Sequence, residues 1–78
     1  MGFESAELEK FKRTCADFLK EVATLDERTL DRAWEAVAKA YLNFDPPSKL
    51  EQIMAVSTFE YCARRKLDRE VALMGELR

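Results

Sequence analysis

The fold is decided by residues 43–51, which read NFDPPSKLE. Pro46 forces the residue before it away from helical backbone angles, and Pro47 does the same to Pro46, so no helix can pass through this stretch. Ser48 and Glu51 have the spacing of a capping box, in which both side chains satisfy free backbone N–H groups at the start of a helix. The stretch therefore predicts that one helix ends near its beginning and that another starts directly after Ser48.

The chain before this break predicts two amphipathic helices, over about residues 5–22 and 25–43. Ser5 is a candidate N-cap for the first helix, and Thr24 with Glu27 forms a second capping box at the start of the second. Apolar residues recur every three or four positions, which is typical of helices with one buried face. They are Leu8, Phe11, Cys15, Phe18 and Val22 in the first helix, and Leu30, Trp34, Val37, Tyr41 and Phe44 in the second.

The chain after the break predicts a third helix over about residues 49–77. Its first half is apolar on almost all sides, so we expect that half to be covered on more than one side. A narrow apolar stripe follows a basic run, and Asp68 could cap a separate short helix. The predicted fold is an all-α three-helix bundle, in which the last helix is either long or broken near residue 67 into a fourth helix.

Helix lengths make the end of the chain a candidate interface. The first two helices would each be about 26 Å long, whereas an unbroken helix over residues 49–77 would be about 43 Å long. We expect this helix to overhang the bundle by roughly three turns. Either the tail folds back, or a second molecule covers its stripe, because exposed apolar stripes usually mark binding sites. The candidate interface residues are Leu67, Val71, Met74, Leu77 and Tyr61.

The composition excludes several classes of functional site. The chain has 78 residues, no histidine and a formal net charge of −2. Without histidine, Ser-His and Cys-His catalysis and His-bearing metal sites are excluded. Gly2 and Gly75 are the only glycines, so no Gly-rich phosphate-binding loop exists. The two cysteines cannot by themselves complete a four-ligand zinc site. The sequence predicts no enzymatic activity, no catalytic residue, no metal or other cofactor and no small-molecule substrate.

Apolar patterning and the N-terminal sequence bear on location. The longest apolar runs are a few residues, whereas a membrane span needs roughly 20. Residues 1–10 are acidic and polar, unlike a secretory signal. We expect a cytoplasmic protein that does not contact membranes, with a single domain over residues 1–78 and a frayed segment over residues 1–4.

Two sets of residues admit both a core and a functional interpretation. Cys15 and Cys62 lie near the middle of two helices that should run parallel, so their thiols could face each other. We predict two buried thiols, with a disulfide or redox switch as the alternative. Trp34, Tyr41 and Phe44 share one helix face; we predict that they belong to the core, with an aromatic binding hot spot as the alternative.

The dense basic cluster comprises Arg64, Arg65, Lys66 and Arg69. We interpret it as a solvated helix surface stabilised by ion pairs four residues apart, with a phosphate or an acidic protein as the alternative ligand. The sequence pI near 5.2 weakens long-range attraction to nucleic acid.

These features predict a small helical protein that binds another protein or its own copies, as an adaptor, an inhibitor or an accessory regulatory subunit. The alternative is a nucleic-acid-binding transcriptional regulator that uses the basic residues 64–69.

Overall fold

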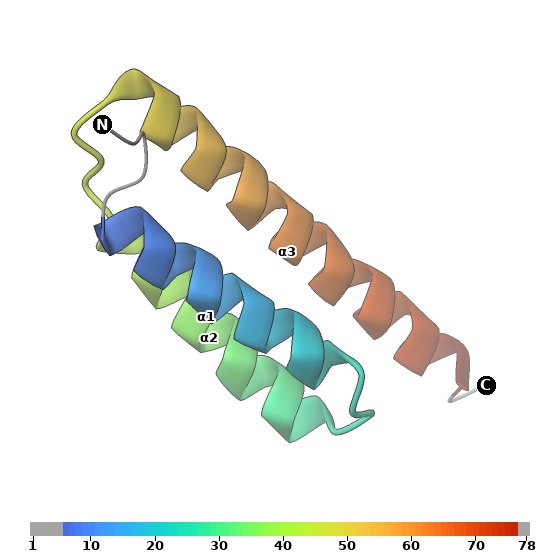
Figure 1. Ribbon diagram of the computed structural model, residues 1–78. Helices are drawn as coiled ribbons and strands as arrows, with labels where there is room; N and C mark the ends of the chain where they lie inside the picture. The colour runs from blue at the N-terminus through green and yellow to red at the C-terminus, as the bar shows by residue number, and fades with distance from the viewer. Residues whose placement is uncertain (1–5, 77–78) are drawn as a thin grey trace.

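The structure is a computed structural model that describes residues 6–76, which form a bundle of three α-helices (Figure 1). The helices are α1 (Ala6–Val22), α2 (Glu27–Leu42) and α3 (Lys49–Glu76), and no strand occurs within these residues. This confirms the all-α three-helix prediction. The third helix is long and unbroken, so no fourth helix forms near residue 67. Ser5, the segment 1–4 and Leu77 lie outside the described residues.

The start of α2 differs from the prediction. Asp26, not Thr24, is the N-cap: its carboxylate accepts the backbone N–H of Arg28 at 3.0 Å and the hydroxyl of Thr29 at 2.8 Å. The Thr24 hydroxyl instead donates to a carbonyl in the last turn of α1, at 2.9 Å. Between them Leu25 adopts a φ of 73°, which lets the chain reverse before α2 begins. The capping box at residue 24 was therefore placed two residues too early.

The start of α3 agrees with the prediction. The backbone N–H of Glu51 donates to the Ser48 hydroxyl at 3.2 Å, and α3 begins at Lys49. At the other side of the Pro-Pro segment, Asn43 caps α2 and its N–H donates to the Lys39 carbonyl at 3.1 Å. The break between the two helices thus lies where the prolines require it.

Aromatic rings from all three helices pack in and against the buried core. Phe59 of α3 stacks on Tyr41 with the ring centroids 4.2 Å apart, and its ring lies 5.3 Å from that of Trp34. Trp34 in turn lies 5.7 Å from Phe18 of α1, and Phe44 lies 6.0 Å from Phe11. The predicted core placement of Trp34, Tyr41 and Phe44 is confirmed.

The placement of α3 differs from the expected overhang. The helix has 28 residues and is about 42 Å long. Figure 1 shows that its first turns extend beyond the start of α1, because the chain leaving α2 advances along the bundle axis before α3 begins. Its last turns reach the α1–α2 connection, where Ala72 lines a hollow together with Val22 and Ala23, and Leu73 lines another together with Leu30. The final turns therefore have one covered side.

No helix within residues 6–76 is both long enough and apolar enough to cross a lipid bilayer.

Candidate protein-binding surface

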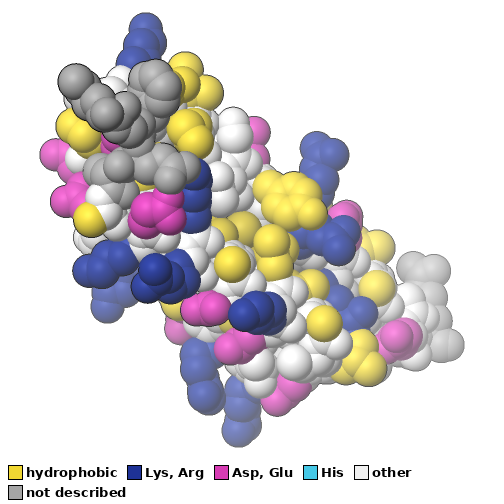
Figure 2. All heavy atoms as spheres, viewed as in Figure 1, with side chains coloured by type: hydrophobic (Ala, Val, Ile, Leu, Met, Phe, Trp, Pro, Cys, Tyr) yellow, Lys and Arg dark blue, Asp and Glu magenta, His cyan; other side chains and the backbone are white. Residues whose placement is uncertain are grey.

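The main group of exposed hydrophobic side chains lies on the side of α3 opposite its buried residues Ala55 and Cys62. We call this side the outer face. Hydrophobic side chains reach the surface along α3 among charged ones (Figure 2). The large apolar members of the outer face and their exposed fractions are Leu50 at 42 %, Ile53 at 56 %, Tyr61 at 54 %, Leu67 at 60 %, Val71 at 61 % and Met74 at 67 %.

The outer face follows from helical spacing. Positions separated alternately by three and four residues fall on one stripe of an α-helix. Such positions run continuously from Leu50 to Met74, and the middle three are the exposed polar residues Ser57, Glu60 and Arg64. The stripe is therefore apolar at both ends and polar at its centre.

The structure brings together four of the five residues predicted for the interface. Tyr61, Leu67, Val71 and Met74 are all exposed on the outer face. The fifth lies beyond residue 76. Their backbone is a continuous helix whose opposite side is packed, so the stripe is presented on a fixed scaffold.

Sequence reasoning missed the first part of the stripe. The apolar first half of α3 was expected to be covered on several sides, but Leu50 and Ile53 are exposed. Only one side of α3 contacts α1 and α2, so the residues on the other side have no covering helix within residues 6–76. Continuing the three–four spacing backward from Leu67 would have identified both residues.

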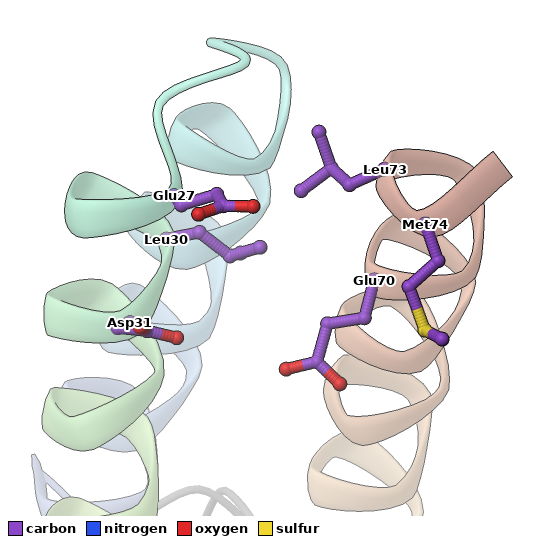
Figure 3. A pocket seen from close by; sticks show the side chains of 6 residues that line it. All are labelled: Glu27, Leu30, Asp31, Glu70, Leu73 and Met74. Atoms are coloured by element: carbon purple, nitrogen blue, oxygen red, sulfur yellow. The ribbon is translucent and has the colours of Figure 1, made fainter. Parts of the chain in front are cut away.

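A seam between α2 and α3 borders the outer face near its C-terminal end. It has a volume of about 290 Å³, and Figure 3 shows side chains from the two helices facing each other across it. The lining residues are Glu27, Leu30, Asp31, Glu70, Leu73 and Met74. Lys66 offsets part of the acidic charge, since its ammonium group pairs with Glu70 and lies 3.9 Å from Asp31. Within residues 6–76 no three acidic or thiol side chains are placed to hold a metal ion.

The four basic residues predicted as a cluster do not share one side of α3. Consecutive residues on an α-helix point about 100° apart, which separates Arg64, Arg65 and Lys66 around α3. Arg64 is exposed on the outer face, whereas the Lys66 side chain is only 18 % exposed and lies 6.0 Å from the Trp34 ring centroid. Arg65 and Arg69 both line a hollow at the end of α1, and Arg69 Nη2 is buried without a hydrogen-bond partner among residues 6–76. The structure therefore forms no continuous basic surface from these four side chains.

The two cysteines meet in the core, as their mid-helix positions predicted. Both are free thiols, 2 % and 0 % exposed for Cys15 and Cys62, and a hydrogen bond joins them. Burial raises the pKa of the Cys15 thiol to about 12, and burial also raises the pKa of Cys62. Protonated thiols are poor nucleophiles and poor metal ligands, so in this arrangement both act as small apolar core side chains.

No protein-family model, curated protein or solved structure matches this chain.

Proposed function

We propose that this chain is a small non-enzymatic helical protein that acts by binding another protein through the outer face of α3. It would serve as an adaptor, an inhibitor or an accessory regulatory subunit. The observation that carries the proposal is that six large apolar side chains are exposed on one face of a single helix, in two groups at the ends of the stripe. Single exposed hydrophobic residues are ordinary on protein surfaces, but several that gather on one face are typical of an interaction site.

The chemistry of the chain supports a binding role over a catalytic one. The chain contains no histidine, and both thiols are held in the protonated form by burial. These are the side chains that most often supply a general base or a nucleophile near neutral pH. The free thiols also support the proposal of a cytoplasmic location, where thiols are kept reduced.

The alternative of nucleic-acid binding has weaker support. Phosphate recognition is favoured by cations that converge on one surface. Here Lys66 is engaged with Glu70 and Arg69 is partly buried, so Arg64 and Arg65 are the remaining exposed cations of this cluster.

The test is to purify the tagged chain from its native lysate, wash it at high salt and identify the proteins that stay bound to it. High salt weakens charge-driven contacts to phosphate and spares apolar ones. We expect Val71→Glu to lose the retained protein, because it places a charge between Leu67 and Met74 in the C-terminal apolar part of the stripe. The matched control is Leu42→Glu, which introduces the same charge at an 81 % exposed position at the end of α2. Circular dichroism establishes that both variants keep the helical fold.

Loss in Val71→Glu with retention in Leu42→Glu supports the proposal. Equal retention by both variants would show that binding uses another surface. Failure of the wild-type chain to retain either another protein or an untagged second copy would overturn the binding role itself.

A further inference from the structure

We propose that the partner of the outer face is a second copy of this chain, bound with its α3 antiparallel to the first across a two-fold axis at residue 62. This inference rests on the proposed function and names the occupant of the surface. It is carried by the order of apolar and charged residues along the stripe.

The stripe has the spacing of a coiled-coil seam. Counting in sevens, one set of seam positions is Leu50, Ser57, Arg64 and Val71, and the other is Ile53, Glu60, Leu67 and Met74. All eight residues are exposed. In an antiparallel pair, each layer combines a position from one set with a position from the other set of the partner.

An antiparallel register centred on residue 62 matches apolar side chains at both ends. Leu50 meets Met74 of the second copy, and Ile53 meets Val71 of the second copy. The two-fold axis repeats both pairs at the opposite end, which gives four apolar layers. A self-complementary surface of this kind is what a two-fold homodimer requires.

The same register brings opposite charges together at the centre. Glu60 of each copy faces Arg64 of the other, so two ion pairs flank the axis. Neither residue forms an ion pair within residues 6–76, so both charges are available to a partner. A parallel arrangement would instead set Glu60 against Glu60 and Arg64 against Arg64, which like-charge repulsion disfavours. The charge order therefore selects the antiparallel orientation.

The available area is sufficient for a specific dimer. Exposed fractions of 42 to 67 % on six large apolar side chains correspond to roughly 600 Å² per chain. Complete burial of these six side chains in both copies would remove on the order of 1,200 Å² from solvent, which reaches the lower bound for stable, specific interfaces. Tyr61 lies beside the axis, where the aromatic rings of the two copies would adjoin.

The first test exchanges the central charges and measures association by sedimentation equilibrium. Glu60→Arg and Arg64→Glu each create two like-charge pairs, and each should weaken dimerisation at least tenfold. Mixing the two single variants restores opposite charges in both central layers, as does the double variant Glu60→Arg/Arg64→Glu, and both samples should regain wild-type association. Leu42→Glu is the control and should dimerise normally.

The second test establishes orientation through cysteine cross-linking with oxidised glutathione. Residues 50 and 74 lie about 36 Å apart along one helix, so only an antiparallel pair brings them together. A mixture of Leu50→Cys and Met74→Cys chains should cross-link, and neither variant should cross-link alone. Self-cross-linking of Leu50→Cys would overturn the antiparallel register. The buried native thiols supply the unreactive background.

The failures of the two proposals are distinguishable. A wild-type chain that remains monomeric at millimolar concentration overturns the second-copy inference. If that monomer still retains another protein that Val71→Glu loses, the proposed binding function stands. A dimer that survives both single charge reversals overturns the register even if the chain self-associates.

Discussion

Phe59 should be the side chain that holds α3 against α2. It makes both aromatic ring contacts between these helices within residues 6–76, with Tyr41 and Trp34. Apart from these rings, the interface between α2 and α3 is small, since α3 packs more extensively on α1 than on α2. Removing the Phe59 ring should therefore loosen one of the three helix pairs as well as leave a cavity.

The expected magnitude follows from burial. Deleting a fully buried Phe ring costs about 3–5 kcal/mol, and Phe59 is partly buried, so Phe59→Ala should cost about 2–4 kcal/mol. A chain of this length has a total stability of about 4–12 kcal/mol. The substitution thus removes a large share of the free energy of unfolding. Phe59→Leu keeps apolar volume but loses two ring pairs at about 0.5–1.5 kcal/mol each, so it should cost about 1–3 kcal/mol.

The assay is urea unfolding followed by far-ultraviolet circular dichroism, at protein concentrations low enough to exclude self-association. With an m value of about 1 kcal/mol per molar urea, Phe59→Ala should lower the midpoint by about 2–4 M. Val71→Glu is the outer-face control and should leave the midpoint nearly unchanged. A loss below about 1 kcal/mol in Phe59→Ala would refute the reasoning that these ring contacts hold α3 to α2.

Four further predictions concern charged and titratable groups. The Thr29 hydroxyl and the Arg28 N–H hold the pKa of Asp26 below its usual range, so the stabilisation of α2 by this cap should be present at neutral pH and lost as acid protonates Asp26. Asp26→Ala should therefore lower the melting temperature more than Thr24→Ala. An equal effect of the two substitutions would contradict the assignment of Asp26 as the N-cap. Because the pKa of Cys15 is raised to about 12, native chains should react with iodoacetamide at pH 8 at least 1,000-fold more slowly than chains unfolded in urea, and equal rates would contradict the buried pair. The same shift means that unfolded thiols ionise first, so stability should fall as pH rises above about 9 in wild type, and this fall should be smaller in a chain carrying Cys15→Ala. Lys66→Met should lower the free energy of unfolding in urea by less than about 1 kcal/mol, because the Lys66–Glu70 ion pair is partly solvated. The loss should be smaller still at high salt, which screens the pair. A larger loss that does not depend on salt would contradict this prediction.

The sequence alone predicts the three helices but not the exact residues at which they begin and end. Periodicity identified all three helices, and the Pro-Pro pair located the break between α2 and α3. Thr24 and Asp26 are both good N-cap residues, so composition could not choose between them. The choice goes with the left-handed conformation of Leu25, which leucine rarely adopts and which its local sequence therefore does not predict.

Only the C-terminal part of the candidate surface could be predicted from the sequence. Val71 and Met74 belong to a narrow stripe after the basic run, which sequence alone reveals. Leu50 and Ile53 lie in a segment that is apolar on every side, where periodicity does not show which side faces the bundle. Which side of α3 faces the bundle becomes clear only from its packing on α1, where Cys62 is buried against Cys15.

The two sides of α3 use different kinds of apolar residue, and this difference bears on why the outer face exists. The buried apolar positions on the inner side, Ala55 and Cys62, are small, and Cys62 meets Cys15 of α1. The outer positions carry large apolar side chains that stay 42 to 67 % exposed in the bundle. If the bundle alone were being stabilised, polar residues would serve better there, since exposed aliphatic rows favour non-specific association. Polar residues do stand at the centre of the row, where Glu60 and Arg64 interrupt it with opposite charges. An interruption of this kind weakens indiscriminate contacts and favours a partner whose charges run in the opposite order.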